Sequence, residues 1–146
     1  MKGNNKSPNT HFLRRRVLLL ALPLILLSVL LTDCEYQPYS QGENLYKFYC
    51  ANCHMETGLG LKGLIPPLAK ADYLRDHQTD IPCLIKNGIK GNITVNGREY
   101  NTEMAGIPNL TDVQINNIIN YINNAWGNKY GDSNVKKVKK ALKQCD

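Results

Sequence analysis

The most regular pattern of apolar and polar positions lies in the last third of the chain. Apolar side chains recur there at near-helical spacing, at Val113, Ile115, Ile118, Ile119 and Ile122. This period predicts an amphipathic helix that ends around Trp126-Gly127, and Thr111 with Gln114 forms a capping box at its start. The opposite side is expected to be polar, because it carries Asn116, Asn117, Asn120, Asn123 and Asn124. Asparagine is a poor helix former, so burial of the apolar side must stabilise this helix.

Shorter elements are predicted upstream of this helix. The pattern favours short helices over Glu43–Tyr49, Ala69–Leu74 and Pro82–Asn87. Asp80 is a possible cap of the last of these helices. Ile93–Val95 and Arg98–Tyr100 flank Asn96-Gly97, a dipeptide that strongly favours a two-residue hairpin turn. Two strands alone are marginally stable in water, so we expect an all-α domain with one small β-hairpin that leads to Met104.

The N-terminal part follows a different pattern. Residues 1–16 are polar and basic, and residues 17–31 are apolar apart from Pro23 and Ser28. This arrangement is typical of an export signal. The apolar run of 15 residues would be about 22 Å long as a helix, shorter than the roughly 30 Å of a hydrocarbon core. This length disfavours a transmembrane span, although an uncleaved anchor stays open as an alternative.

The residues that follow, Leu31-Thr32-Asp33-Cys34, resemble the box at which bacterial lipoproteins are cleaved and lipidated. Asp33 departs from this box, because that position normally holds a small residue. We expect residues 1–33 to be a lipoprotein-type signal peptide or an N-terminal anchor, with Cys34 lipidated, and residues 34–41 to be a tether. Simple cleavage and a retained anchor are the alternatives. Each outcome places the domain on the periplasmic side of a bacterial membrane.

The chemistry of the chain is concentrated in Cys50-Ala51-Asn52-Cys53-His54. Two thiols at this spacing can each form a thioether with a haem vinyl group, and the histidine directly after them can coordinate the iron. A structural zinc site is less favoured, because no second Cys-x-x-Cys or His-x-x-x-His follows. A thioredoxin-like redox pair needs a strand-helix-strand context, whereas Glu43–Tyr49 looks helical.

Around this motif the chain resembles a class I cytochrome c, over about residues 41–126. Gly42 and Tyr46 reproduce the glycine and the aromatic residue that precede the haem motif in that family. Pro66-Pro67-Leu68 fits the family's Pro-x-Leu segment. There the carbonyl of Pro66 would accept the N–H of the haem histidine, and Leu68 would pack on the ring.

The distal side of the resemblance rests on Met104. It stands just before the last helix, where the family has its distal methionine, although Ala105 replaces the proline that usually follows. Met55 and His77 are the competing ligands. The resemblance implies the class I cytochrome c fold over residues 42–128, with helices around one covalently bound haem c. His54 and Met104 would be the axial ligands of the iron.

The function implied by the resemblance is transfer of single electrons, without catalysis by the protein itself. Its partners would be a redox donor and a redox acceptor, together with the membrane that holds the N-terminal lipid or anchor. Two alternatives remain open. One is a haem subunit of a larger respiratory or dehydrogenase complex, and the other is a haem enzyme or sensor with an open distal site.

The cysteine count extends this interpretation. Of five cysteines, Cys50 and Cys53 are assigned to haem and Cys34 to lipid, which leaves Cys83 and Cys145. In an oxidising compartment these two are expected to form a disulfide, worth about 4 kcal/mol in the chain-entropy model. The alternative is two free thiols, with Cys83 buried and Cys145 at a frayed end.

Charge is concentrated at the C-terminal end. The whole chain has a formal net charge of +6, but residues 34–146 hold 13 Lys and Arg against 11 Asp and Glu. Residues 129–146 hold six of these bases and two of these acids, so the basic balance does not indicate nucleic-acid binding. Val135, Val138 and Leu142 predict a short amphipathic helix in this tail, tethered by the disulfide. One hypothesis for its solvated basic face is that it orients docking to a redox partner.

Overall fold

The computed structural model describes residues 14–19 and 37–145. The chain falls into two units, Met1–Tyr36 and Gln37–Asp146, and each is considered by itself. The described residues of the first unit are helical, whereas Cys34 and most of the predicted signal lie outside the described residues. Within the described part of the chain, no helix is both long and apolar enough to cross a membrane.

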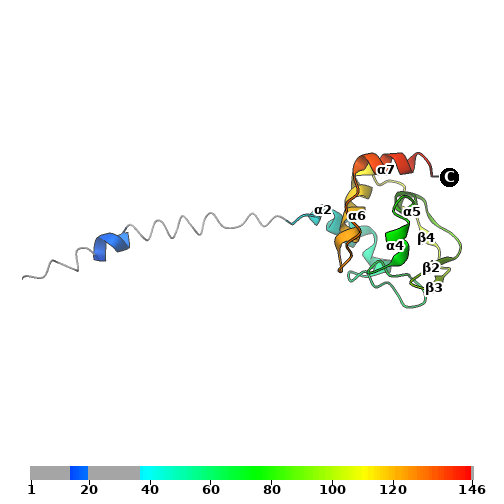
Figure 1. The fold of residues 1–146 in the computed structure, drawn as a ribbon, viewed down its shortest axis with the longest axis horizontal. Helices are drawn as coiled ribbons and strands as arrows, with labels where there is room; N and C mark the ends of the chain where they lie inside the picture. The colour runs from blue at the N-terminus through cyan, green and yellow to red at the C-terminus, as the bar shows by residue number, and fades with distance from the viewer. Residues whose placement is uncertain (1–13, 20–36, 146) are drawn as a thin grey trace, which may run out of the picture. The chain divides into compact units, whose positions relative to one another are not determined.

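Two crossing helices frame the second unit (Figure 1), α2 (Ser40–Tyr49) and α6 (Asp112–Asn124). They make the most extensive contact between elements of this unit. Gly42 lies at the crossing, where a Cβ atom would overlap the backbone carbonyl of Asn117. The prediction for the start of α2 is corrected, because the N–H of Glu43 already bonds the carbonyl of Tyr39 at 2.9 Å. The helix therefore begins inside the predicted tether of residues 34–41.

The capping box of α6 is confirmed. Thr111 Oγ1 accepts from the backbone N–H of Gln114 at 3.3 Å, and Gln114 Oε1 accepts from the N–H of Thr111 at 2.9 Å. The apolar stripe is confirmed at four of its five positions, Ile115, Ile118, Ile119 and Ile122. Val113 is the exception, with 52% of its surface exposed, because at about 100° per residue it lies on the opposite side of the helix from Ile115.

The polar side of α6 is not exposed along its whole length. Asn116 and Asn123 are buried. The side chain of Asn123 donates to Gln78 Oε1 at 2.6 Å and to the carbonyl of Gly131 at 3.0 Å. Gln78, 45 residues away in the sequence, and the nearer Gly131 therefore supply partners for the amide of Asn123, which compensates for its burial.

The short helix predicted over Ala69–Leu74 begins later, as α4 (Asp72–Asp76). The reason is a tertiary contact. Lys70 adopts a φ of 54°, and its N–H donates to Asn128 Oδ1 at 2.7 Å. This conformation is left-handed, so a right-handed helix can begin only after it.

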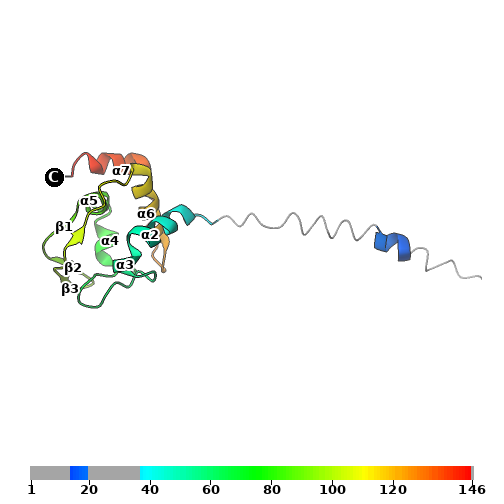
Figure 2. The same ribbon diagram turned by 180° about the vertical axis from the view of Figure 1, so that it is seen from behind.

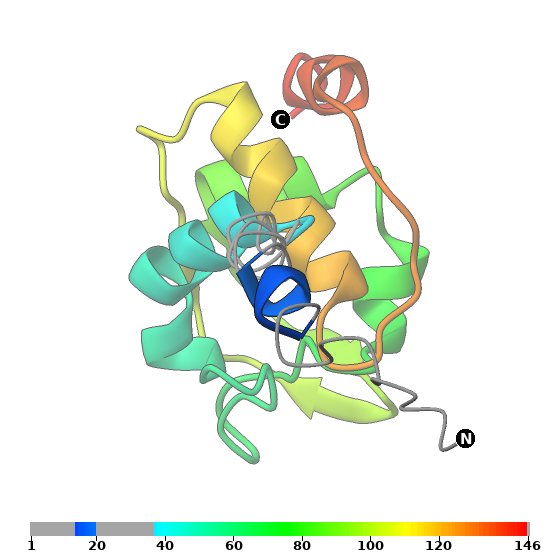
Figure 3. The ribbon, with the colours of Figure 1, turned by 90° about the vertical axis from the view of Figure 1, so that its left-hand side faces the viewer.

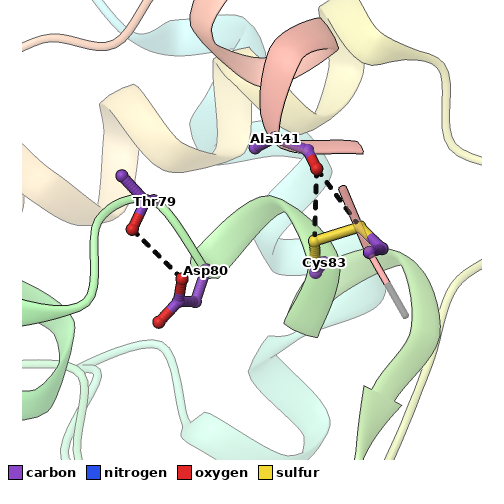
Figure 4. Close-up of a disulfide and its surroundings, with 5 residues drawn as sticks. Thr79, Asp80, Cys83 and Ala141 are labelled. Carbon is purple, nitrogen blue, oxygen red and sulfur yellow. Dashed lines mark hydrogen bonds between the residues drawn. A yellow bond between two sulfur atoms is a disulfide. The ribbon is translucent and has the colours of Figure 1, made fainter. Parts of the chain in front are cut away.

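The next helix, α5 (Ile81–Asn87), begins one residue before the predicted Pro82. Asp80 occupies its N-cap position, but its side chain caps no backbone N–H. Its carboxylate instead accepts the hydroxyl of Thr79 at 3.1 Å, as Figure 4 shows. The predicted capping role of Asp80 is therefore wrong.

The predicted hairpin is confirmed as β2 (Ile93–Val95) and β3 (Arg98–Tyr100), which pair antiparallel with Ile93 opposite Tyr100. A second antiparallel pair, β1 (Gly88–Ile89) and β4 (Met104–Ala105), was not predicted. Two residues per strand give no alternation that a sequence pattern could reveal. Figure 2 shows β1 following α5 directly.

The C-terminal tail forms α7 (Val135–Leu142), which packs on α5 and α6. Val138 is fully buried, and Cys145 is joined to Cys83 of α5 by a disulfide (Figure 4). The two sulfur atoms lie 3.6 and 3.7 Å from the carbonyl oxygen of Ala141. A disulfide sulfur has no proton to donate, so these are contacts and not hydrogen bonds. The domain is thus mostly helical, with two small sheets.

Candidate functional site

A largely apolar cavity of about 410 Å³ lies inside the second unit. Its walls come from the end of α2, from α3 (Ala51–His54), from the loop before α4, and from α5, α6 and both sheets. All six residues expected at the haem site line it: Cys50, Cys53, His54, Pro66, Leu68 and Met104. A volume of this size is typical of a cofactor site.

The two motif cysteines lie at the start of one short helix: Cys50 precedes α3, and Cys53 lies within it. The carbonyl of Cys50 accepts from the N–H of Cys53 at 3.1 Å and from the N–H of His54 at 2.9 Å, so residues 50 and 53 share one face of the turn. Both are free thiols, Cys50 half-buried and Cys53 exposed. Burial raises the pKa of the Cys50 thiol to about 11, with a smaller contribution from the neighbouring Cys53.

These thiols do not resemble the alternatives considered for the motif. In a thioredoxin-like pair the reactive cysteine has a lowered pKa, whereas the pKa of Cys50 is raised. A structural zinc site needs about four ligands, and the described residues contain no cluster of three or more His, Cys, Asp and Glu side chains that could hold a metal ion. Covalent attachment of a cofactor is the chemistry that fits the two thiols.

His54 is buried, with 8% of its surface exposed. Its Nδ1 lies 3.1 Å from the carbonyl oxygen of Pro66, which can only accept, so Nδ1 carries the proton and Nε2 keeps a free lone pair. Burial lowers the pKa of His54, against a smaller opposing effect of the Pro66 hydrogen bond. A neutral imidazole with a fixed tautomer is suited to bind a metal.

Met104 approaches the cavity from another direction. It is half-buried in β4, opposite Ile89 of β1, and Ala105 stands opposite Gly88 in the same ladder. Neither of the competing ligands lines the cavity. The backbone of Met55 has a φ of 62° and its carbonyl accepts the hydroxyl of Tyr46 at 2.6 Å. Met104 therefore supplies the thioether that is available to the cavity.

The second competitor, His77, is engaged elsewhere. Its ring stacks on Tyr73 with a centroid separation of 4.0 Å, and its Nδ1 lies 3.0 Å from the carbonyl oxygen of Tyr73. It has no place in the lining of the cavity. These contacts give His77 a structural role on α4.

Sequence reasoning did not assign the contacts that hold the histidine side in place. Trp126 Nε1 donates to the carbonyl of Glu56 at 2.9 Å, and the Tyr46 hydroxyl bonds the carbonyl of the neighbouring Met55. The rings of Tyr46, Tyr121 and Trp126 pack together, with centroids 5.0 to 5.4 Å apart. The position of Trp126 just after α6 was the one available signal. Its partner could not be read from the sequence.

Comparison with known proteins identifies the family. Residues 39–126 match the sequence model for cytochrome c. The chain belongs to the cytochrome c family. Two proteins named cytochrome c-552, both from Thermus thermophilus, are each 34% identical to it over 92 residues. The match spans 60% of this chain and 70% and 62% of theirs.

A further relative is the cytochrome c subunit of the alcohol dehydrogenase (quinone) of Gluconobacter oxydans strain 621H. It is 32% identical over 91 residues, which is 60% of this chain and 18% of that subunit. As a member of the family, this cytochrome is an electron-transfer protein that binds c-type haem covalently. Two thiols on one turn, a neutral buried imidazole and an apolar cavity fit that group.

Proposed function

We propose that this cytochrome is a single-electron carrier of a bacterial envelope electron-transfer chain, with one haem c bound through Cys50 and Cys53. In this proposal His54 and Met104 would supply the two protein ligands of the iron. The main support is that both thiols, the imidazole and the thioether line the same cavity. When bound, the haem supplies a reversible one-electron couple.

The residues of the cavity have separate tasks in this function. The carbonyl of Pro66 fixes the His54 ring, 3.1 Å from Nδ1, which raises the basicity of the ligand. The soft sulfur of Met104 favours the reduced metal and raises the potential. Apolar side chains from α5, such as Ile81, Leu84 and Ile85, exclude water from the cavity. With His54 and Met104 both bound to it, the iron would have no position open to a substrate.

The proposal includes export and anchoring. Residues 1–33 are a lipoprotein-type signal peptide or anchor, and Cys34 is the lipidated residue. The support is the order of the segments: a basic start, an apolar run of 15 residues and the Leu31-Thr32-Asp33-Cys34 box, followed by the haem-binding domain. The mature protein would then lie on the periplasmic side of the membrane.

The test is to purify the protein from membranes and record its intact mass and visible spectrum. The expected mass is that of a chain starting at Cys34 with one porphyrin and lipid, and the oxidised spectrum should contain the sulfur-to-iron charge-transfer band. Met104→Ala should remove this band, whereas Met55→Ala should retain it as the matched control. A colourless protein without the porphyrin mass would overturn the haem assignment, and a band that survives Met104→Ala would overturn the ligand.

A second candidate function is favoured by one comparison. The relative from Gluconobacter oxydans is named as a subunit of a dehydrogenase, so this cytochrome could work as the haem subunit of a larger complex. Stable co-purification with a dehydrogenase or an oxidase, through size exclusion in mild detergent, would support this role. A monodisperse cytochrome that exchanges electrons by collision would support the free carrier.

A further inference from the structure

We propose that the lysine face of α7 is a docking surface for the anionic headgroups of the bilayer to which the protein is anchored. This inference rests on the N-terminal anchoring proposed above. It goes beyond it by assigning an orientation: the end of the domain that carries α7 faces the membrane. Four observations support it.

The first observation is the one-sided charge of α7. Its exposed lysines are Lys136, Lys137, Lys139, Lys140 and Lys143. At 3.6 residues per turn these five positions fall within an arc of about 160°. Residues 133–145 contain no carboxylate, and none of the ion pairs found among the described residues uses these lysines. The helix therefore presents a face of positive charge, and the nearest carboxylates in the sequence are those of Asp132 before it and Asp146 after it.

The second observation is that the opposite face of α7 is fixed to the protein. Val138 is fully buried, Leu142 packs on the core, and the disulfide from Cys145 to Cys83 holds the end of the tail. Asn134 caps the start, where its Oδ1 accepts from the N–H of Lys137 at 3.0 Å. The apolar side is thus not available for insertion into lipid. The exposed residues of α7 itself are all lysines, which favours electrostatic attraction to a charged surface.

The third observation is the position of α7 relative to the N-terminal connection of the domain. The hydroxyl of Tyr39, just before α2, donates to Asp132 Oδ1 at 2.8 Å, shortly before α7 begins. Asn124 of α6 donates to the same oxygen at 3.0 Å. Cys34 precedes Tyr39 by five residues, which span at most about 18 Å when fully extended. A lipid on Cys34 would therefore keep the start of α7 close to the bilayer surface.

The fourth observation distinguishes a bilayer from an acidic partner protein. No residue of α7 lines the cavity, and α7 and the β2–β3 hairpin lie at opposite ends of the domain in Figures 1, 2 and 3. A redox partner seated on α7 would not cover the cavity through which electrons must pass. A bilayer at this face leaves the cavity free for such a partner.

The test uses the full, haem-loaded chain reconstituted in vesicles. One set of vesicles is pure phosphatidylcholine, and the other contains phosphatidylcholine with 30 mole per cent phosphatidylglycerol. The salt concentration is about 0.1 M, which is low enough for surface charge to act. Each lysine is acetylated by a water-soluble reagent under single-hit conditions, and its rate is read by mass spectrometry. The α7 lysines should react at least about 5-fold more slowly on the anionic vesicles, since each lysine near such a surface contributes about a factor of five. High salt should remove this difference. Lys62, Lys70 and Lys90, which are exposed elsewhere, should react equally on both.

Matched variants test the same point. K136Q/K140Q/K143Q should lower the equilibrium constant for docking about 100-fold and expose Lys137 and Lys139 to the reagent. K62Q/K70Q/K90Q removes equal charge and should retain the protection. Equal rates on both vesicle types would overturn the docking surface. So would protection that appears only in native membranes, which would assign α7 to an acidic protein. Flotation with pure phosphatidylcholine vesicles tests the N-terminal anchor separately. A protein that does not float with these vesicles is not anchored.

Discussion

The two sides of the haem cavity differ in how firmly hydrogen bonds hold them. The histidine side, residues 50–68, is held by many short hydrogen bonds: Gly60 donates to the carbonyl of His54 at 3.0 Å, and Leu68 donates to the carbonyl of Gly58 at 2.7 Å. The methionine side, residues 88–89 and 101–106, has a ladder of two residues per strand, and Met104 there is only half-buried. The comparison teaches that one ligand is fixed by its own loop, while the other depends on the elements behind it.

The element behind Met104 is α5. Gly88 of β1 follows Asn87 at the end of α5 without a loop, and β1 pairs with β4. The disulfide joins α5 to the end of α7. The methionine side is therefore supported from outside the cavity. The disulfide at Cys83 holds α5, α5 leads into β1, and β1 pairs with the strand that carries Met104.

The largest effect is expected from removing this support. The double variant C83A/C145A opens a link across 62 residues, which should lower the free energy of unfolding by about 4 kcal/mol. The charge-transfer band should disappear at lower guanidinium concentration than the helical circular dichroism, because the methionine side loses its support first. Loss of both signals in a single transition would contradict this order. Reduction of the unmodified protein by dithiothreitol provides a control without a mutation for the loss of unfolding free energy. It is followed by circular dichroism alone, because the reagent would also reduce the haem iron and so remove the band.

The next effect tests the histidine side. Gly60 has a φ of 63°, and a Cβ there would overlap the carbonyls of Ile65 and Pro66. Gly60→Ala should therefore cost about 2 to 4 kcal/mol and displace the carbonyl that orients His54. Gly63→Ala is the control, because Gly63 has a φ of 83° but nothing within 4 Å of the added Cβ; it should cost about 1 kcal/mol. Guanidinium unfolding followed at the Soret band measures both, and equal costs would refute the account.

A smaller global effect is expected on the methionine side. Gly88 has a φ of 81°, and a Cβ there would overlap the carbonyl of Met104. Gly88→Ala should weaken the charge-transfer band of the oxidised protein, with a loss of about 1 to 3 kcal/mol. Gly91→Ala, with a φ of 95° and open space around it, should leave the band intact. An unchanged band in Gly88→Ala would show that β1 does not determine the position of Met104.

The smallest effect is expected at the exposed pair Lys90 and Glu103, 3.2 Å apart. Glu103 directly precedes Met104, so a contribution of this pair to the ligand would show in the same band. Exposed ion pairs contribute little to stability, and Glu103→Gln should change neither the band nor the unfolding midpoint. A clear shift of either quantity would mean that the methionine side depends on surface charge.

Much of this architecture could be predicted from the sequence where its cause is local. The capping box of Thr111 and Gln114, the isoleucine period of α6 and the turn at Asn96-Gly97 lie within a few residues of the elements they define. The spacing of Cys50, Cys53 and His54 is equally local, so the thiols and the imidazole could be assigned together.

The errors arise where the cause is distant. The start of α4 depends on Lys70 and Asn128, which are 58 residues apart, and the burial of Asn123 depends on Gln78, 45 residues away. The β1–β4 ladder is too short to leave a pattern. At the site, the contact of Trp126 with Glu56 spans 70 residues. Such pairs exist only after the chain has folded, so residue spacing carries no sign of them.

The placement of side chains around α5 has one more consequence. Ile81, Leu84 and Ile85 face the cavity, while Cys83 points to α7 and carries the disulfide. Inserting a single residue after Cys83 would rotate everything beyond it by about 100° about the helix axis, turning Leu84 and Ile85 away from the porphyrin. The seven residues of this helix thus connect the C-terminal tail to the wall of the haem cavity. The length of the helix is therefore as constrained as its sequence.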